Sequence, residues 1–196
     1  MIFYAKQRRL DGVAVTDHDT LDGALKMKKQ TDFPIIPGME ISSQDGHVLA
    51  LNVQEPVPKG LGAAETVDRV HEAGGIAIAC HPLTFFKGSL RSHVNSRFDA
   101  IEVINSSAFP FRHSLNNSEQ MASRLGLPRV GGSDAHYGPE IGCAYTLINA
   151  EPRSDEIVKA IRQGLCQPFG GAMPFALRLK REIGLSGKKL TSFVIR

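Results

Sequence analysis

The stretch "VAVTDHDTLDG", residues 13–23, decides how the rest of the sequence is interpreted. Its first four residues, Val13 to Thr16, have the β-branched and small apolar character of a buried strand. Asp17, His18 and Asp19 follow at once. Because ionisable groups beside a core are costly unless they bind a partner, this pattern predicts a metal site or an acid–base site at the end of the strand.

Short aliphatic runs alternate with helical segments along the whole chain. The runs are "VAV", "PII", "HVLALNV", "GIAIAC", "DAIEVI", "RVGG" and "AYTLI", and the helical segments are "LDGALKMKKQ", "AAETVDRVHEAG", "NSEQMASRLG" and "RSDEIVKAIRQG". The last segment has Ser154 as its expected N-cap and Gly164 at its end. The alternation predicts an α/β protein with a largely parallel sheet, either open or closed into a barrel. A Gln-Asp-Gly turn at residues 44–46 predicts one hairpin within this pattern.

Composition is that of an ordinary globular protein. The chain has 196 residues, of which 42% are hydrophobic and 22% are charged, so one sizeable core is expected. No apolar run approaches the roughly 18 residues of a membrane span, and the N-terminus lacks a secretion signal. We therefore expect a cytoplasmic protein without a membrane partner. The cysteines, Cys80, Cys143 and Cys166, show no paired spacing, so we expect small buried residues rather than disulfides or a thiolate zinc site.

The C-terminal segment is basic although the net charge of the chain is only +3. After Leu177 the sequence contains a single acidic residue, Glu182. It contains six basic residues there: Arg178, Lys180, Arg181, Lys188, Lys189 and Arg196. Charge runs of this kind are usually solvated faces, which favours a solvated or frayed helix over a contact with a phosphate backbone. The sequence therefore predicts one domain over residues 1–170 and a basic tail over residues 171–196.

Ionisable residues follow several of the predicted strands, in the same way as His18. "PIIPGM" is followed by Glu40, "GIAIAC" by His81, and "RVGGS" by Asp134 and His136. Catalytic groups collect at the carboxyl ends of strands in α/β proteins, where loops from different units converge. We therefore expect these side chains to share one cleft. His47, where the strand after the hairpin turn begins, has the same chemistry and joins the candidate site.

Imidazole and carboxylate ligands without thiolates suit zinc, manganese or iron. A single histidine at a strand end is more often structural, but Glu40 lies between Met39 and Ile41, where a carboxylate needs a cation or another partner. Asp134 and His136, two residues apart in an extended chain, point the same way. The remaining histidines are weaker candidates: His71 lies in a predicted helix, His93 lies in a polar loop, and the role of His113 is undecided.

In order along the chain, the motifs "TDHDT", "GMEIS", "GHVLALNV", "GGIAIACHP", "AIEVINSS" and "GGSDAH" resemble those of the PHP family, the polymerase and histidinol phosphatase phosphoesterases. The resemblance runs from about Leu10 to Gly164. It implies a distorted β/α barrel of seven units with up to three divalent ions at the carboxyl ends of its strands. The ligand positions of the family fall on the residues already selected: His18, Glu40, His47, His81, Asp134 and His136.

One departure from the family pattern affects the expected metal content. Family members open with a strand bearing a His-x-His pair, and this sequence begins instead with "MIFYAKQRRLDG", which reads as the helix after that strand. We therefore expect a barrel without its first strand and one or two ions rather than three. Glu40, His47 and His81 would bind the first ion, and His18 and His136 would bind a weaker second ion. Exposed sheet edges would be covered by distortion or by a homodimer.

The resemblance implies hydrolysis of phosphate esters of small nucleotides or nucleic-acid ends. Glu40 would bridge ions, with His18, Asp134 and His136 as its catalytic partners, and Asp17 or Asp19 would orient a ligating imidazole. Cations for the substrate phosphate are sought in the loops, and the candidates are Lys87, Arg91 and Arg112.

Two other functions stay open at this point. Because the His-x-His pair is absent, the domain could be a metal-binding scaffold without turnover, and we expect weak or no activity for this 196-residue form. An amidohydrolase-like enzyme also uses histidine and aspartate at strand ends. The order of "TDHDT" and "GGSDAH" favours the PHP family over the amidohydrolases.

Overall fold

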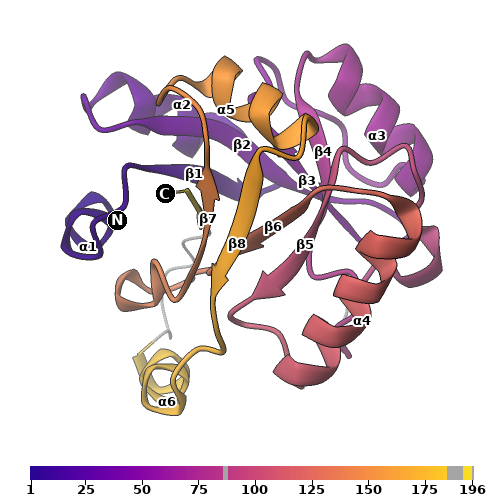
Figure 1. Ribbon diagram of the computed structural model, residues 1–196. Helices are drawn as coiled ribbons and strands as arrows, with labels where there is room; N and C mark the ends of the chain where they lie inside the picture. Colours follow the sequence, from indigo (N-terminus) through magenta and orange to yellow (C-terminus); the bar gives the residue numbers. More distant parts are fainter. Residues whose placement is uncertain (86–87, 185–191, 196) are drawn as a thin grey trace.

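Nine strands form one curled sheet in the computed structural model, which describes residues 1–85, 88–184 and 192–195 (Figure 1). The order across the sheet is β6-β5-β4-β3-β2-β1-β9-β7-β8. In chain order the strands are β1 (Gly12–His18), β2 (Ile35–Ser42), β3 (His47–Leu51), β4 (Ile76–Ala79), β5 (Ala100–Asn105), β6 (Arg129–Gly132), β7 (Ala144–Ile148), β8 (Cys166–Gly170) and β9 (Ser192–Ile195).

Helices surround the sheet (Figure 1). They are α1 (Ile2–Gln7), α2 (Asp22–Lys29), α3 (Ala63–Glu72), α4 (Phe111–Leu125), α5 (Ser154–Arg162) and α6 (Phe175–Gly184), with short 3₁₀ turns at η1 (Arg91–His93) and η2 (Gly138–Glu140). The predicted helices are thus confirmed, and α4 begins earlier than its sequence pattern indicated. Ser154 is the first helical residue of α5 and not its N-cap, which is Arg153 without a side-chain capping bond. No helix among the described residues is long and apolar enough to cross a membrane.

The sheet mixes parallel and antiparallel pairs. Strand β1 pairs in parallel with β2, and β4, β5 and β6 pair in parallel in turn. Strand β3 is antiparallel to both β2 and β4, which confirms the hairpin predicted from the Gln-Asp-Gly turn. The other edge of β1 pairs with β9 in the antiparallel sense. The segment predicted as a basic tail therefore contributes α6 and β9, and β9 occupies the edge of β1 that the sequence left without a partner.

The two ends of the strand order come together because the sheet curls. Thr146 on β7 donates its hydroxyl to the Gly131 carbonyl at 2.8 Å and accepts from the Gly131 amide at 2.9 Å. A Cβ at Gly131, on β6, would lie 3.2 Å from the Pro168 side chain on β8, so glycine permits this close approach. The architecture is an α/β half-barrel with a curled sheet, and a complete barrel of seven units stays a prediction.

Alternation along each strand separates two layers of core. One layer lies between the sheet and helices α1 to α4 and includes Val13, Val15, Met39 and Val67. The opposite face is apolar at its amino-terminal end, where Ala14, Ile36, Leu49 and Ile78 pack with Ile157 and Ile161 of α5. On that same face, further along β1 and β2, the alternation places His18 and Glu40. The candidate site therefore occupies the end of the inner face that α5 does not fill.

Candidate metal centre

A cavity of about 200 Å³ opens at the carboxyl ends of the strands, and all six predicted ligands line it. They are His18, Glu40, His47, His81, Asp134 and His136. The other lining residues are Thr84, Asn105, Ser107 and Ala108, from the loops after β4 and β5 and from the end of β5. The structure thus brings the predicted ligands together from β1, β2, β3 and the segments after β4 and β6. Whether they bind metal stays a prediction.

Glu40 is the centre of the cluster. Its carboxylate lies 2.6 Å from His47 Nδ1, 3.1 Å from His81 Nε2 and 3.7 Å from His18 Nε2. Burial by itself would raise the pKa of Glu40, but the His47 and His81 rings outweigh burial and hold that pKa well below its usual range. A carboxylate that stays ionised among three imidazoles is the arrangement expected of a metal ligand.

Two groups of three residues in the described chain have ligand atoms close enough to share an ion. The first contains His18, Glu40 and His47, and the second contains Glu40, Cys80 and His81. These groups differ from the predicted trio of Glu40, His47 and His81, because the ligand atoms of His18 and His47 lie close together and Cys80 lies beside His81. Burial raises the pKa of the Cys80 thiol to about 12, so that sulfur is a protonated neighbour here rather than a thiolate.

Asp134 and His136 form the opposite wall. His136 Nδ1 lies 3.5 Å from Asp134 Oδ1, and the backbone amide of His136 donates to Glu140 at 2.8 Å. Asp134 and His81 both have left-handed backbone conformations, with φ of +46° and +33°. Non-glycine residues adopt such angles at a cost and cluster at functional sites. In both cases the strained residue is one that delivers a side chain to the cavity.

A buried acidic layer lies beneath the ligands. Glu102 accepts the His81 amide at 2.8 Å and the Asn105 side-chain amide at 2.9 Å. Burial raises the pKa of Glu102 to about 7. Burial and the nearby Glu40 charge also raise the pKa of Asp134. Glu40, Glu102 and Asp134 thus place three buried carboxyl groups at one site, and a divalent cation would offset the charge of those that ionise.

The geometry around His47 tests whether the residues fit a metal ion. Its Nδ1 atom is buried and has no aligned hydrogen-bond partner, although Glu40 Oε1 lies only 2.6 Å away. Buried polar groups normally form hydrogen bonds. A cation bound beside Glu40 would supply the partner that His47 Nδ1 lacks. The donor set of imidazole nitrogens and carboxylate oxygens therefore fits zinc or manganese.

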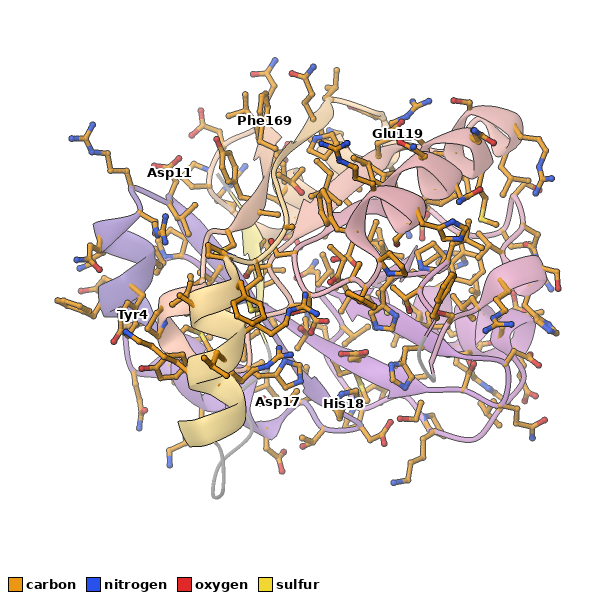
Figure 2. The ribbon with its side chains drawn as sticks, turned by 90° about the horizontal axis from the view of Figure 1, so that it is seen from below. Tyr4, Asp11, Asp17, His18, Glu119 and Phe169 are labelled. Atoms are coloured by element: carbon orange, nitrogen blue, oxygen red, sulfur yellow. The ribbon has the colours of Figure 1, made fainter. Side chains whose placement is uncertain are left out.

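Asp17 and Asp19, one of which was expected to orient a ligating imidazole, have contacts with other parts of the chain. Asp19 accepts the Ser42 amide at 2.8 Å and lies 3.5 Å from Lys59 Nζ, so it connects β1 to the end of β2. The pKa of Asp19 is lowered because these contacts outweigh its burial. Asp17 is adjacent to His18 at the carboxyl end of β1, where Figure 2 labels both, and its carboxylate lies next to Gly23 on α2.

Predicted and observed cations differ in position. Lys87 lies outside the described residues. Arg91 and Arg112 are exposed and do not line the cavity. Two arginines of α6 instead contact Ser107, which lines the cavity. Arg178 donates to the Ser107 carbonyl at 3.3 Å, and Arg181 donates to the Ser107 hydroxyl at 3.4 Å.

The remaining histidines lie away from the cavity. His71 on α3 pairs with Asp99 at 2.7 Å, and His93 lies 3.5 Å from Asp45. His113 on α4 packs edge-on against Phe85 with 5.0 Å between ring centroids. The sequence had likewise given these three histidines as weaker candidates for the metal site.

Sequence reasoning did not select Glu102, Asn105, Ser107 or Glu140. Glu102 had a usable signal, because it is the one carboxylate within the apolar strand β5 and is fully buried. Glu140 is likewise fully buried and accepts the amides of His136 and Tyr137. Ser107 had no such signal, since its position at the cavity depends on the loop after β5.

A family model described as "PHP-associated" matches residues 112–166. An uncharacterized protein of Methanocaldococcus jannaschii, MJ1587, is 34% identical over 105 residues, which cover 52% of this chain and 61% of that protein. The chain therefore spans less than two thirds of that relative.

Two solved structures share the fold at low identity. A two-domain protein of Bacteroides vulgatus, containing a predicted PHP-like metal-dependent phosphoesterase, superposes with a TM-score of 0.65 at 15% identity, over 82% of this chain and 56% of that one. PsfC of Pseudomonas syringae superposes with a TM-score of 0.68 at 19% identity, over 92% of this chain and 85% of that one. The chain is therefore similar to the PHP-associated family model over residues 112–166, and it shares its fold with a structure that contains a predicted PHP-like metal-dependent phosphoesterase.

Proposed function

We propose that this chain hydrolyses phosphate esters with the help of divalent metal ions bound in the cavity at the strand ends. The observation that supports this most strongly is the environment of Glu40. One buried carboxylate faces three imidazoles, from His18, His47 and His81, within 3.7 Å. One of these ring nitrogens, His47 Nδ1, is buried without an aligned hydrogen-bond partner, and a bound cation would supply one.

The residues around Glu40 would hold the ions. His18, His47 and His81 would bind ions together with the Glu40 carboxylate, and Asp134 and His136 would contribute from across the cavity. When bound, divalent ions polarise phosphoryl oxygens and make water a stronger nucleophile at neutral pH. Glu102 and Glu140 would hold the backbone of His81 and of His136 in place through their amide contacts.

Positive charge for the substrate would come from α6. Arg178 and Arg181 reach Ser107 at the edge of the cavity, and guanidinium groups bind phosphate oxygens with directed hydrogen bonds. Arg181 also lies 3.8 Å from the buried Glu140, which fixes it near the side that carries His136. These two arginines replace Arg91 and Arg112 as our candidates, and Lys87 stays a prediction. Small nucleotides and nucleic-acid ends remain the proposed substrates on the strength of the family resemblance.

The test is hydrolysis of 4-nitrophenyl phosphate by the purified chain with and without added Mn²⁺ or Zn²⁺. Glu40→Gln keeps the size of the side chain and removes its charge, and Glu119→Gln, on the exterior of α4, is the matched control. A bound ion contributes several kcal/mol to catalysis and 1.4 kcal/mol is about tenfold in rate, so we expect Glu40→Gln to lose on the order of 100-fold or more.

The proposal would be refuted by turnover that survives both chelation and Glu40→Gln. Metal bound at Glu40 without any turnover would instead identify the domain as a metal-binding scaffold, the alternative left open by the sequence. Metal analysis of the same samples therefore accompanies the activity measurement.

A further inference from the structure

Two exposed phenylalanines border the cavity. Phe85 directly follows the lining residue Thr84, and Phe109 directly follows the lining residue Ala108. Their exposed fractions are 61% and 52%, which is high for large apolar side chains. The two loops are held together, since the Phe85 amide donates to the Phe109 carbonyl at 3.4 Å. The edge of the cavity thus presents two aromatic rings to solvent from different loops.

Neighbouring side chains hold each ring in place. The guanidinium of Arg178 lies 5.8 Å from the Phe109 ring centroid and also donates to the Ser107 carbonyl. The Phe85 ring packs edge-on against His113. An exposed ring held by a cation or by a second ring loses less conformational entropy when a ligand binds, so it is suited to stacking.

The size of the cavity requires part of the substrate to lie outside it. Its volume is about 200 Å³, below the roughly 300–1,000 Å³ of sites that enclose a whole small molecule. Metal ions and a phosphoryl group would take up most of this space. The alcohol part of the ester must then extend over the edge, where Phe85, Phe109 and Arg178 are the side chains it would meet.

We propose that Phe85 and Phe109 are specificity residues that select phosphate esters whose alcohol carries a planar aromatic ring, which stacks on them at the edge of the cavity. This inference rests on the proposed function, because it assumes that the phosphoryl group occupies the cavity. Stacking of a base on an aromatic side chain contributes about 1–3 kcal/mol by alanine substitution. Removing one ring should therefore lower the preference for the aromatic ester, measured as a ratio of kcat/KM values, by about tenfold.

Adenosine 5′-monophosphate and ribose 5-phosphate form the matched substrate pair, since they share the ester and differ by the ring. The measurement is the ratio of their kcat/KM values for the parent chain, Phe109→Ala and Phe85→Ala, with Mn²⁺ present. We expect a ratio of about ten or more for the parent chain and a fall toward one in either variant. Phe109→Tyr keeps a ring and should keep the ratio. Phe3→Ala, at an exposed phenylalanine on α1, should also keep it.

Equal kcat/KM values for the two esters in the parent chain would overturn the inference. A ratio unchanged in Phe109→Ala and Phe85→Ala would do the same and would identify the two rings as part of a contact surface for another molecule. If neither ester is hydrolysed, the proposed function fails separately, and calorimetric titration of both compounds onto the metal-loaded chain decides the inference. Tighter binding of the adenosine compound that is lost in Phe109→Ala supports it, and equal binding refutes it.

Discussion

His18 and Glu40 are direct partners in the parallel ladder between β1 and β2, and His18 Nε2 lies 3.7 Å from Glu40 Oε2. The pairing explains how two residues 22 positions apart in the sequence reach one site. Each is on the inner face of its strand, and the register of the sheet sets them side by side. The rest of the candidate metal centre is arranged around this pair.

The histidines should differ in their effect on metal content. His47 and His81 both contact Glu40, whereas His136 pairs with Asp134 across the cavity. We expect His47→Ala and His81→Ala to remove most of the zinc retained after dialysis, because each substitution removes an imidazole that would bind the ion together with Glu40. His136→Ala should keep an ion at Glu40. Elemental analysis of the dialysed proteins measures this.

His71→Ala is the control for that series, since His71 lies on α3 and pairs with Asp99 outside the cavity. Full zinc content in His47→Ala, or a loss in His136→Ala as large as in His81→Ala, would contradict the ranking.

Gly88 should be required for the position of the His47 ring. Its φ is +93°, and a Cβ there would lie 2.5–2.8 Å from three atoms of that ring. Alanine at a left-handed position costs about 1–2 kcal/mol of stability, and the collision would also displace the imidazole. We expect Gly88→Ala to bind zinc about tenfold or more weakly, as measured by competition with a chelating dye.

Gly60→Ala separates the two effects. Gly60 has a φ of +77° and no atom within 4 Å of its would-be Cβ, so this variant should lose stability and keep zinc affinity. Equal zinc affinities in the two variants would show that the contact between Gly88 and His47 is irrelevant to binding.

Asp99 should contribute strongly to stability, because its carboxylate joins three elements. It accepts from the Ala77 amide at 2.8 Å, pairs with His71 at 2.7 Å and accepts from Arg162 at 2.9 Å. Asparagine cannot satisfy all three donors. Since hydrogen bonds to charged groups contribute about 1.5–3 kcal/mol, we expect Asp99→Asn to lower the free energy of unfolding by about 1–3 kcal/mol in urea denaturation.

The exposed pair of Asp68 and Arg97 provides the comparison. Asp68→Asn should cost less than about 1 kcal/mol, the usual range for a solvent-exposed ion pair. Similar losses for both variants would argue against a special role of Asp99.

Cys166 should be a slowly reacting thiol near neutral pH. Burial raises its pKa to about 11, and the thiolate is the form that reacts. Raising the pKa keeps the thiol protonated at pH 8, so the rate of alkylation by iodoacetamide in the native protein should rise steadily between pH 8 and pH 11. In the unfolded protein the rate should level off near pH 9, as for an unperturbed cysteine. Mass spectrometry of the labelled peptide follows the reaction, and a native rate at pH 8 equal to the unfolded rate would disprove the prediction.

Local patterns in the sequence were enough to find six residues that line the cavity. Short aliphatic and β-branched runs before His18, Glu40 and His81 identify strands, and the ionisable residue after each run marks the end of the strand that lies at the cavity. These signals lie within a few neighbouring residues, so they can be recognised without knowledge of the fold. Buried Glu102 could have been found by the same rule, as a carboxylate within an apolar strand.

The sheet closure and the cavity edge were decided by tertiary structure alone. Contact between Thr146 and Gly131, and between Arg178 and Ser107, joins residues 15 and 71 positions apart through the curl of the sheet and the packing of α6. The basic run that contains Arg178 was predicted to be a solvated tail. A sequence gives the number of charges in a segment but not the direction in which their side chains point. The sequence by itself determined which residue types could bind metal and phosphate. Only the folded chain decided which cations face the site, since register, curl and helix packing are set by contacts between distant segments.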